Sequence, residues 1–265
     1  MLVIVKTKSD PELISQSDHC ADMDQAMDSN KTNSKSNKAN SNEAAKTVGK
    51  ITTKPPSLPA KSVATLAALD LADDTEYGDF VLHAQTIVGQ TFDRVTIERA
   101  FLKQVRWSTT TLAKSKLVDI RFENCDLSNS EFQDGKFTRV EMVDCKVTGL
   151  HITDAEIGDL LMQNCTGGPV QFHDSIFKRT MFHTCNLRSA DFRFCNLEGA
   201  VFKDCDLQEA EFYEAKLMGT DFRSSNIMGI KAHPADLRGA VIDSDQAALL
   251  GRHFATLLGM EVKEG

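Results

Sequence analysis

The chain has 265 residues, of which 41% are apolar, and it carries a formal net charge of −8. This length allows one large domain or two small ones, and the acidic balance argues against a general nucleic-acid binder with a basic surface. No stretch approaches 18 consecutive apolar residues, so no membrane span is expected, and the apolar start Met1–Val5 is too short for a signal peptide. The 7 cysteines form no C-x-x-C pair, which predicts a reducing, cytoplasmic environment.

The first 60 residues differ in composition from the rest of the chain. Residues 29–42 are rich in Ser, Asn and Lys and contain no large apolar residue. Such a segment cannot bury enough surface to offset its ordering entropy, so we expect residues 1–60 to be disordered and to end in a stiffer, proline-containing linker. Residues 61–80 have two open interpretations, a short helix or a linker with nascent helix.

A repeat with a period of five begins near residue 90. From Phe92 to Ile242 every fifth residue is large and apolar, except Gly167 and Ala232, and the residue two positions earlier is always small or aliphatic. A helix cannot keep this period on one face because five residues turn it through about 500°, and a strand repeats every two residues. A chain that turns a corner every five residues satisfies both inward positions. The sequence therefore predicts a solenoid of square cross-section, with four pentapeptides in each coil.

Several of these units match a known repeat. Ala190–Phe194, Cys195–Gly199 and Ala235–Gly239 resemble the A-(D/N)-L-x-x unit of the pentapeptide repeat protein family. The resemblance implies an all-β fold over residues 81–245, a right-handed quadrilateral parallel β-helix of about seven to eight coils, in which residues 20 apart stack at about 4.8 Å. Residues 122–165 lack the Asp/Asn preference, so we expect less regular turns there.

Most cysteines occupy the small inward position, and five of them recur one coil apart. A metal or redox ladder and a set of buried, space-filling thiols are both conceivable. Stacked thiols without a histidine at the same position offer no tetrahedral site, which favours the second interpretation, with no metal and no cofactor. The five residues are Cys125, Cys145, Cys165, Cys185 and Cys205.

The segment Gly167-Gly168-Pro169 interrupts the pattern, which resumes unshifted at Phe172. A local bulge or widened corner explains it better than a binding loop does. No insertion breaks the register elsewhere, so the faces should be flat. The sequence also lacks G-x-S-x-G, G-x-x-x-x-G-K and H-E-x-x-H motifs, and a filled solenoid has no cleft in which to desolvate a catalytic group. We therefore do not expect an enzyme.

After Ile242 the pattern changes to that of a helix, expected over residues 246–265. Asp243 and Gln246 have the spacing of a capping box. This helix can cap the open end of the solenoid, and the resemblance implies that it can also form a homodimer, as in several family members. The apolar residues of the candidate dimer interface are Leu249, Leu250, Phe254, Leu257 and Leu258.

The function expected from these features is that of a non-catalytic, rigid scaffold for a protein partner that the sequence does not identify. The alternative, implied by the gyrase-binding, quinolone-resistance-type members of the family, is a DNA mimic that modulates DNA gyrase or topoisomerase IV. Neither requires direct nucleic-acid or membrane binding. A continuous acidic stripe would favour mimicry and an exposed apolar patch a protein dock. The candidate acidic binding face consists of Asp191, Glu198, Asp206, Glu209, Glu211, Glu214 and Asp221.

Overall fold

The structure is a computed structural model that describes residues 6–7, 53–59, 64–66 and 71–261. The disorder expected for residues 1–60 therefore falls mostly outside the described residues, as does the end of the chain after residue 261. The side chain of Leu257, one of the candidate dimer residues, is also outside the description.

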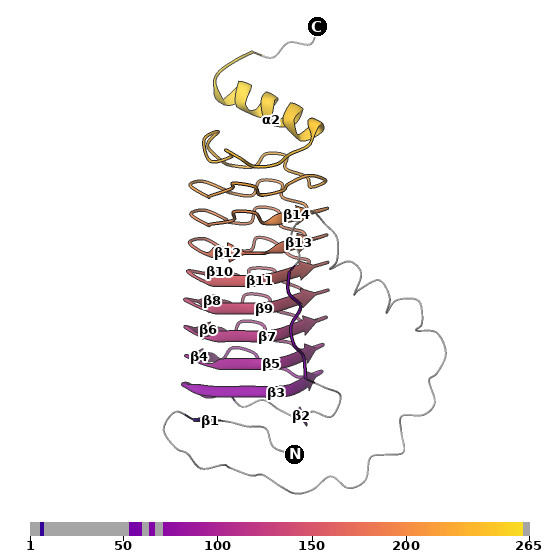
Figure 1. The fold of residues 1–265 in the computed structure, drawn as a ribbon, viewed down its shortest axis with the longest axis vertical. Coiled ribbons are helices and arrows are strands. Elements are labelled where there is room, and N and C mark those ends of the chain that lie inside the picture. Colours follow the sequence, from indigo (N-terminus) through magenta and orange to yellow (C-terminus); the bar gives the residue numbers. More distant parts are fainter. Residues whose placement is uncertain (1–5, 8–52, 60–63, 67–70, 262–265) are drawn as a thin grey trace, which may run out of the picture.

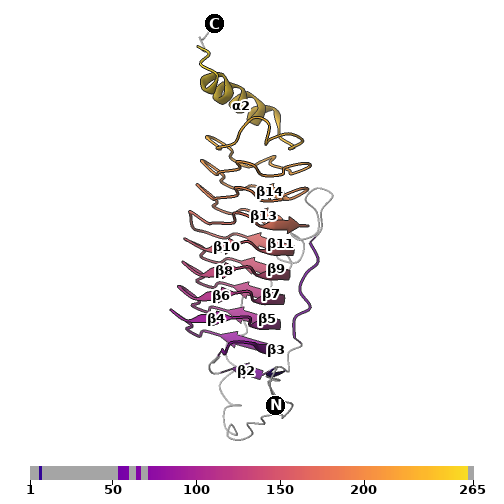
Figure 2. The same cartoon turned by 90° about the vertical axis from the view of Figure 1, so that its left-hand side faces the viewer.

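The chain forms a parallel β-solenoid that ends in one helix (Figures 1 and 2). Within the solenoid the strands pair in parallel with residues 20 apart, as in Glu76 with Thr96. The larger sheet has the order β1 (Lys6–Thr7), β3 (Thr75–His83), β5 (Thr96–Lys103), β7 (Lys116–Glu123), β9 (Lys136–Val143), β11 (Glu156–Gln163), β13 (Met181–His183) and β14 (Val201–Lys203), with β2 (Ala64–Leu66) on β3 and β12 (Ile176–Lys178) on β11. The smaller sheet has the order β10 (His151–Thr153), β8 (Glu131–Gln133), β6 (Thr111–Ala113) and β4 (Thr91–Asp93).

A corner recurs every five residues, which confirms the predicted square coil. Except at Pro169 and Pro234, the corner residue has a positive φ, for example Asn124 at 54° and Asn129 at 54°. The expectation of less regular turns over residues 122–165 is wrong, because β9 and β11 lie there and the corners continue without interruption. The Asp/Asn preference of the repeat is lost at a position that is not the corner. The corner residue lies two positions before that one, and there Asn and Asp remain frequent and tolerate the left-handed conformation.

The inward residues form columns that run through the solenoid. Phe182 and Phe202, one coil apart, have ring centroids 4.7 Å apart and planes within 5° of parallel. Ser and Thr at the small inward position also form hydrogen bonds, because their hydroxyl groups donate to a backbone carbonyl of the preceding coil. Thr220 Oγ1, for example, donates to the Leu197 carbonyl at 2.8 Å. This bond explains why Ser, Thr and Cys are accepted at a buried position.

The solenoid begins earlier than the sequence indicated. Tyr77 and Leu82 continue the inward register and are buried, so the first coil includes β3 rather than starting at residue 81. The short helix considered within residues 61–80 is not formed over the described part, where β2 pairs with β3. Strand ladders account for about six turns, slightly fewer than the seven to eight expected. Towards the C-terminus the coils are held by single bridges such as Asp206 with Asn226.

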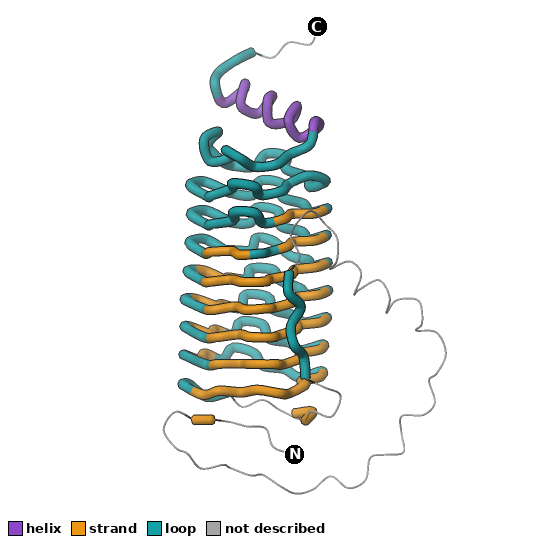
Figure 3. The backbone as a smooth tube through the Cα atoms, viewed as in Figure 1, coloured by secondary structure: helices purple, strands orange, loops and turns teal. Residues whose placement is uncertain are grey.

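Residues 53–59 lie along the outside of the solenoid (Figure 3). The segment runs parallel to the solenoid axis, and Lys54 and Ser57 each donate a backbone hydrogen bond to a solenoid side chain. The expected disorder of residues 1–60 is therefore wrong for this part, because the segment has a complementary surface against which to order.

The Gly167-Gly168-Pro169 segment is a distortion within the register. Gly167 has a φ of 138°, and a Cβ there would collide with the backbone nitrogen of Thr148. The ladder continues on both sides, because Gly149 N donates to the Pro169 carbonyl at 3.0 Å and His151 pairs with Gln171. The segment thus forms the local bulge or widened corner that the sequence favoured.

The helix α2 spans Ser244–Leu257 and is capped as predicted. The Asp243 side chain accepts from the Gln246 backbone, and the Gln246 side chain accepts from the Asp243 backbone. Because Asp243 is the N-cap, the helix starts two residues before the expected residue 246. Within the described part of the chain, none of the helices is long and apolar enough to cross a membrane.

Candidate interaction surfaces

The seven candidate acidic residues do not gather on one face. Residues must be a multiple of 20 apart to stack, and of the seven only Asp191 and Glu211 are, as their bridge confirms. Asp206 bridges with Asn186 and Asn226, and Asp221 with Val201 and Val241, so these two residues lie on other faces. The register therefore distributes the acidic residues around the coil instead of aligning them along the rod.

Four of the seven acidic side chains have a cationic partner. Asp191 pairs with Arg193 at 2.7 Å and Asp221 with Arg223 at 2.6 Å, in each case two residues along the chain. Burial alone would raise the pKa of Asp191, but hydrogen bonds from Arg193 outweigh burial and hold this pKa below its usual value. The other two pairs are Asp206 with Arg188 at 3.6 Å and Glu211 with Lys231 at 2.9 Å.

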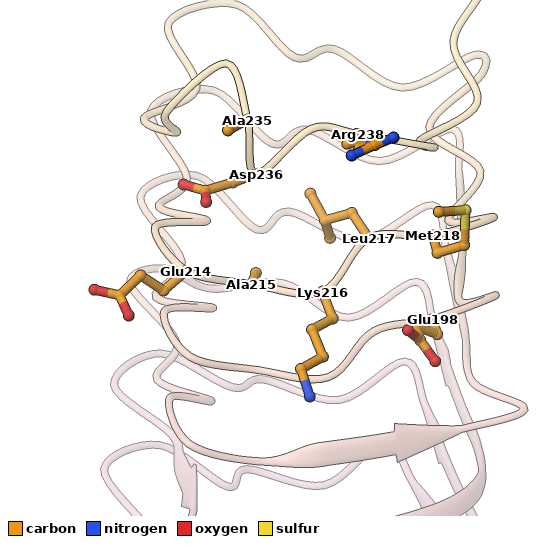
Figure 4. A pocket seen from close by; sticks show the side chains of 9 residues that line it. All are labelled: Glu198, Glu214, Ala215, Lys216, Leu217, Met218, Ala235, Asp236 and Arg238. Atoms are coloured by element: carbon orange, nitrogen blue, oxygen red, sulfur yellow. The ribbon is translucent and has the colours of Figure 1, made fainter.

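Among the described residues, Glu198, Glu209 and Glu214 have no cation within ion-pair distance. Glu198 and Glu214 line an open hollow of about 250 Å³ near the C-terminal end of the solenoid. Figure 4 shows Glu214 on one side of this hollow and Met218 and Arg238 on the other. Its lining residues are Glu198, Glu214, Ala215, Lys216, Leu217, Met218, Ala235, Asp236 and Arg238.

The hollow exists because the last repeat opens. Ala235–Gly239 matches the repeat in sequence, yet these residues form turns in which Ala235 is exposed and Leu237 is only partly buried. The hollow mixes carboxylates with Lys216 and Arg238, so it does not concentrate charge of one sign. Its open shape leaves these groups hydrated, which suits surface recognition rather than acid–base chemistry.

Exposed apolar side chains lie on and beside the face of the solenoid that carries this hollow. Ile176, Asn196 and Lys216 are bridged one coil apart and define what we call the Lys216 face. Phe194 stands at one edge of this face and is 50% exposed, and its backbone N–H donates to the Tyr213 carbonyl at 3.0 Å. Sequence reasoning missed these residues because the outward positions carry no periodic constraint. The exposed apolar residues on or beside this face are Ile176, Phe194, Tyr213 and Met218.

The candidate dimer residues of α2 are divided between the cap and the solvent. Leu250 is buried, and Leu249 and Phe254 are partly buried against the solenoid core. Leu258, by contrast, is 69% exposed. The helix therefore caps the solenoid with one side and leaves an apolar residue exposed at its C-terminal end.

The inward cysteines are free thiols within the apolar core. Cys195 Sγ donates to the Phe172 carbonyl at 2.9 Å, and burial raises the pKa of this thiol to about 12. No group of three or more His, Cys, Asp or Glu residues within the described ranges has an arrangement that could hold a metal ion. The geometry is that of space-filling thiols.

The comparisons with known proteins concern the repeat itself. Residues 115–192 match the model of a pentapeptide repeat region, and residues 185–223 match pentapeptide repeats. No curated protein sequence matches the chain.

Similar solved structures include that of QnrB1, a plasmid-mediated fluoroquinolone resistance protein. The two chains are 13% identical with a TM-score of 0.31, and the match covers 72% of this chain and 100% of the QnrB1 chain. HetL from the cyanobacterium Nostoc, a pentapeptide repeat protein involved in heterocyst differentiation regulation, is 14% identical with a TM-score of 0.22, covering 64% and 90%. Together, the family models and the four-cornered solenoid with its five-residue period show that the chain belongs to the pentapeptide repeat protein family.

Proposed function

We propose that this protein is a non-catalytic, rigid scaffold that binds a partner protein through the Lys216 face. The observation that carries the proposal is the group of exposed apolar side chains on and beside that face, which borders the charged hollow. Aromatic and Met side chains are enriched at protein interfaces, where a polar rim surrounds them. The stacked coils hold these side chains in fixed positions, so little conformational entropy is lost on binding.

A DNA mimic that modulates DNA gyrase or topoisomerase IV is the alternative. The rod shape and the net charge of −8 support it. However, duplex DNA carries about one charge per 1.7 Å of axis, and here Asp191 and Asp221 are paired with arginine. The pairing and the distribution of the acidic side chains over several faces favour the scaffold.

Capture experiments with matched variants test the scaffold. Wild type, Phe194→Glu/Tyr213→Glu and Val88→Glu chains would be immobilised, and bound proteins identified. Val88 is also exposed and apolar, at 42%, but lies in an early coil. We expect a protein that wild type and Val88→Glu retain and the double variant loses. A set of bound proteins that is the same for all three chains would contradict the proposal. Dose-dependent inhibition of gyrase supercoiling, undiminished in the double variant, would establish the alternative.

We also propose that the protein is a homodimer through the exposed end of α2. The cap uses Leu250, which leaves Leu258 and Met260 available to a second copy at 69% and 59% exposure. End-to-end contact of this kind would keep the Lys216 face free on both copies.

A further inference from the structure

One corner of the solenoid carries charges of alternating sign. Its residues follow one another at intervals of 20, so they stack coil upon coil, and all have a positive φ. We call this column the Asp/Arg corner, and it consists of Asp79, Arg99, Asp119, Arg139, Asp159 and Arg179.

The corner forms three ion pairs of the same geometry. In each pair the arginine of one coil uses two nitrogens to bind both carboxylate oxygens of the coil before it, as in Arg139 with Asp119 at 2.6 and 2.7 Å. The Arg99–Asp79 pair has two bonds of 2.6 Å, and the Arg179–Asp159 pair has bonds of 2.7 and 2.6 Å. Two-pronged contacts of this kind fix the carboxylates in position.

Two of the three carboxylates also bind the chain's own segment 53–59. Ser57 N donates to Asp119 Oδ1 at 2.8 Å, and Lys54 N donates to Asp159 Oδ1 at 3.1 Å. The Asp119 and Asp159 side chains are 9% and 3% exposed. The Asp79 side chain accepts no hydrogen bond from the described residues of the segment and is 50% exposed. Figures 1 and 3 show the segment crossing the coils that hold the two bound carboxylates.

The spacing of the bound carboxylates matches an extended, proline-containing chain. Asp119 and Asp159 are two coils apart, about 9.6 Å at a strand spacing of about 4.8 Å. Lys54 and Ser57 are three residues apart, which spans about 9.3 Å in a polyproline II chain with a rise of about 3.1 Å per residue. Pro55 and Pro56 between them favour that conformation and have no N–H that would need a partner.

We propose that the Asp/Arg corner is a binding groove for an extended, proline-containing peptide segment, and that residues 53–59 occupy it in this chain. The groove recognises two backbone N–H groups three residues apart, each of which donates to a carboxylate that an arginine already holds in place. The recognised features are the extended conformation and the spacing of the donors. The Asp/Arg corner borders the Lys216 face, since Arg179 follows Ile176 by three residues, but Asp119 and Asp159 lie in earlier coils than that face. The groove does not depend on the proposed function.

Variants of the segment in the full chain test this occupancy. Lys54→Pro/Ser57→Pro removes both N–H donors and keeps the extended conformation, whereas Lys54→Ala/Ser57→Ala changes the same side chains and keeps the donors. The probe is a fluorescent peptide with the sequence of residues 50–60, followed by anisotropy. We expect the proline variant to bind it at least tenfold more tightly than wild type or the alanine variant, because its groove is free. Equal binding by all three chains would overturn the proposal, as would equal binding of a peptide with proline at positions 54 and 57.

The carboxylates are tested in the Lys54→Pro/Ser57→Pro chain. Asp119→Asn and Asp159→Asn should each weaken peptide binding at least tenfold. Asp79→Asn is the matched control. It removes the charge of a carboxylate that also pairs with an arginine but accepts no hydrogen bond from the described residues of the segment, so peptide binding should not change. An equal loss in all three would show that the ion pairs act through the fold and not as the groove. If wild type is a dimer by light scattering and only the proline variant is a monomer, the segment comes from a second copy, which would overturn occupancy within one chain.

Discussion

The ring of Phe202 stacks on the ring of Phe182 from the preceding coil, with centroids 4.7 Å apart and planes within 5° of parallel. Phe222 continues this column at 5.2 Å. A second column, of Phe172, Phe192 and Phe212, meets the first edge to face, as between Phe192 and Phe202 at 5.5 Å. The C-terminal half of the core thus contains two aromatic columns in contact, and Phe202 touches both.

Phe202→Ala should therefore lower the free energy of unfolding by about 3–5 kcal/mol, because it removes a buried ring and leaves a cavity that the neighbouring coils cannot fill. Tyr213→Ala, at an exposed aromatic residue two pentapeptides further along, should change it by less than about 1 kcal/mol. Urea denaturation monitored by circular dichroism gives both values. A similar loss in the two variants would mean that the inward faces are wrongly assigned.

Gln246→Ala should loosen the end of the solenoid. The Gln246 side chain donates to the Phe222 carbonyl at 2.7 Å and to the Ser225 carbonyl at 2.6 Å, and thereby satisfies two acceptors of the last coils. The loss of these two hydrogen bonds should lower the free energy of unfolding by about 1–3 kcal/mol. Hydrogen exchange should accelerate in residues 220–250 but not in the first coils. Gln133→Ala, at an exposed glutamine, is the control, and uniform acceleration along the chain would contradict a local cap.

The inward thiols should not react with a water-soluble disulfide reagent in the native protein. Burial raises the pKa of Cys195 to about 12. For Cys145, Cys165 and Cys185 the contact with the preceding thiol lowers the pKa, but the contact with the following thiol and burial outweigh it, so these pKa values are also raised. At pH 8 these thiols are protonated and inaccessible. In a Cys20→Ser chain we expect slow labelling in buffer and complete labelling in denaturant. Rapid native labelling would show that the core is open.

Binding of the 50–60 peptide to the Lys54→Pro/Ser57→Pro chain should depend on pH only in the acid range. A hydrogen bond from Arg139, against the opposing effect of burial, holds the pKa of Asp119 below its usual value of 3.8, and Ser57 N lowers it further. For Asp159, burial alone would raise the pKa, but Arg179 and Lys54 N outweigh burial and lower it. Because the pKa of each carboxyl group is lowered, the contribution of that carboxylate to peptide binding is complete above its ordinary pKa. The contribution is lost as the pH falls through the lowered pKa. Affinity should thus be constant from pH 7 to about 5 and fall below about 4, and a loss between pH 7 and 5 would contradict the assignment.

Leu258→Glu should convert the proposed dimer into a monomer without unfolding it. Leu258 is 69% exposed, so a charge there does not disturb the cap, whereas Leu250 is buried in the cap and a charge there should destabilise the end of the solenoid. Light scattering should give half the wild-type mass for Leu258→Glu and the full mass for Val88→Glu. A monomeric wild type would show that α2 acts as a cap alone.

The five-residue period by itself determined the square coil, the inward columns and the stacking of residues 20 apart, because a buried position can hold few side chains and repeats its constraint in every coil. Asp243 and Gln246 determined the start of the helix in the same local way, since a capping box needs only neighbouring residues. The sequence placed the first coil too late, because the inward residues Tyr77 and Leu82 precede the regular part of the pattern.

The tertiary structure decided what the outward residues do. Outward positions accept almost any side chain, so their sequence does not show that Phe194 and Tyr213 lie side by side or that the candidate acidic residues fall on different faces. The contact of Lys54 with Asp159 joins residues 105 positions apart. It depends on the match between the rise of an extended segment and the distance between coils, which becomes visible only when the coils are stacked.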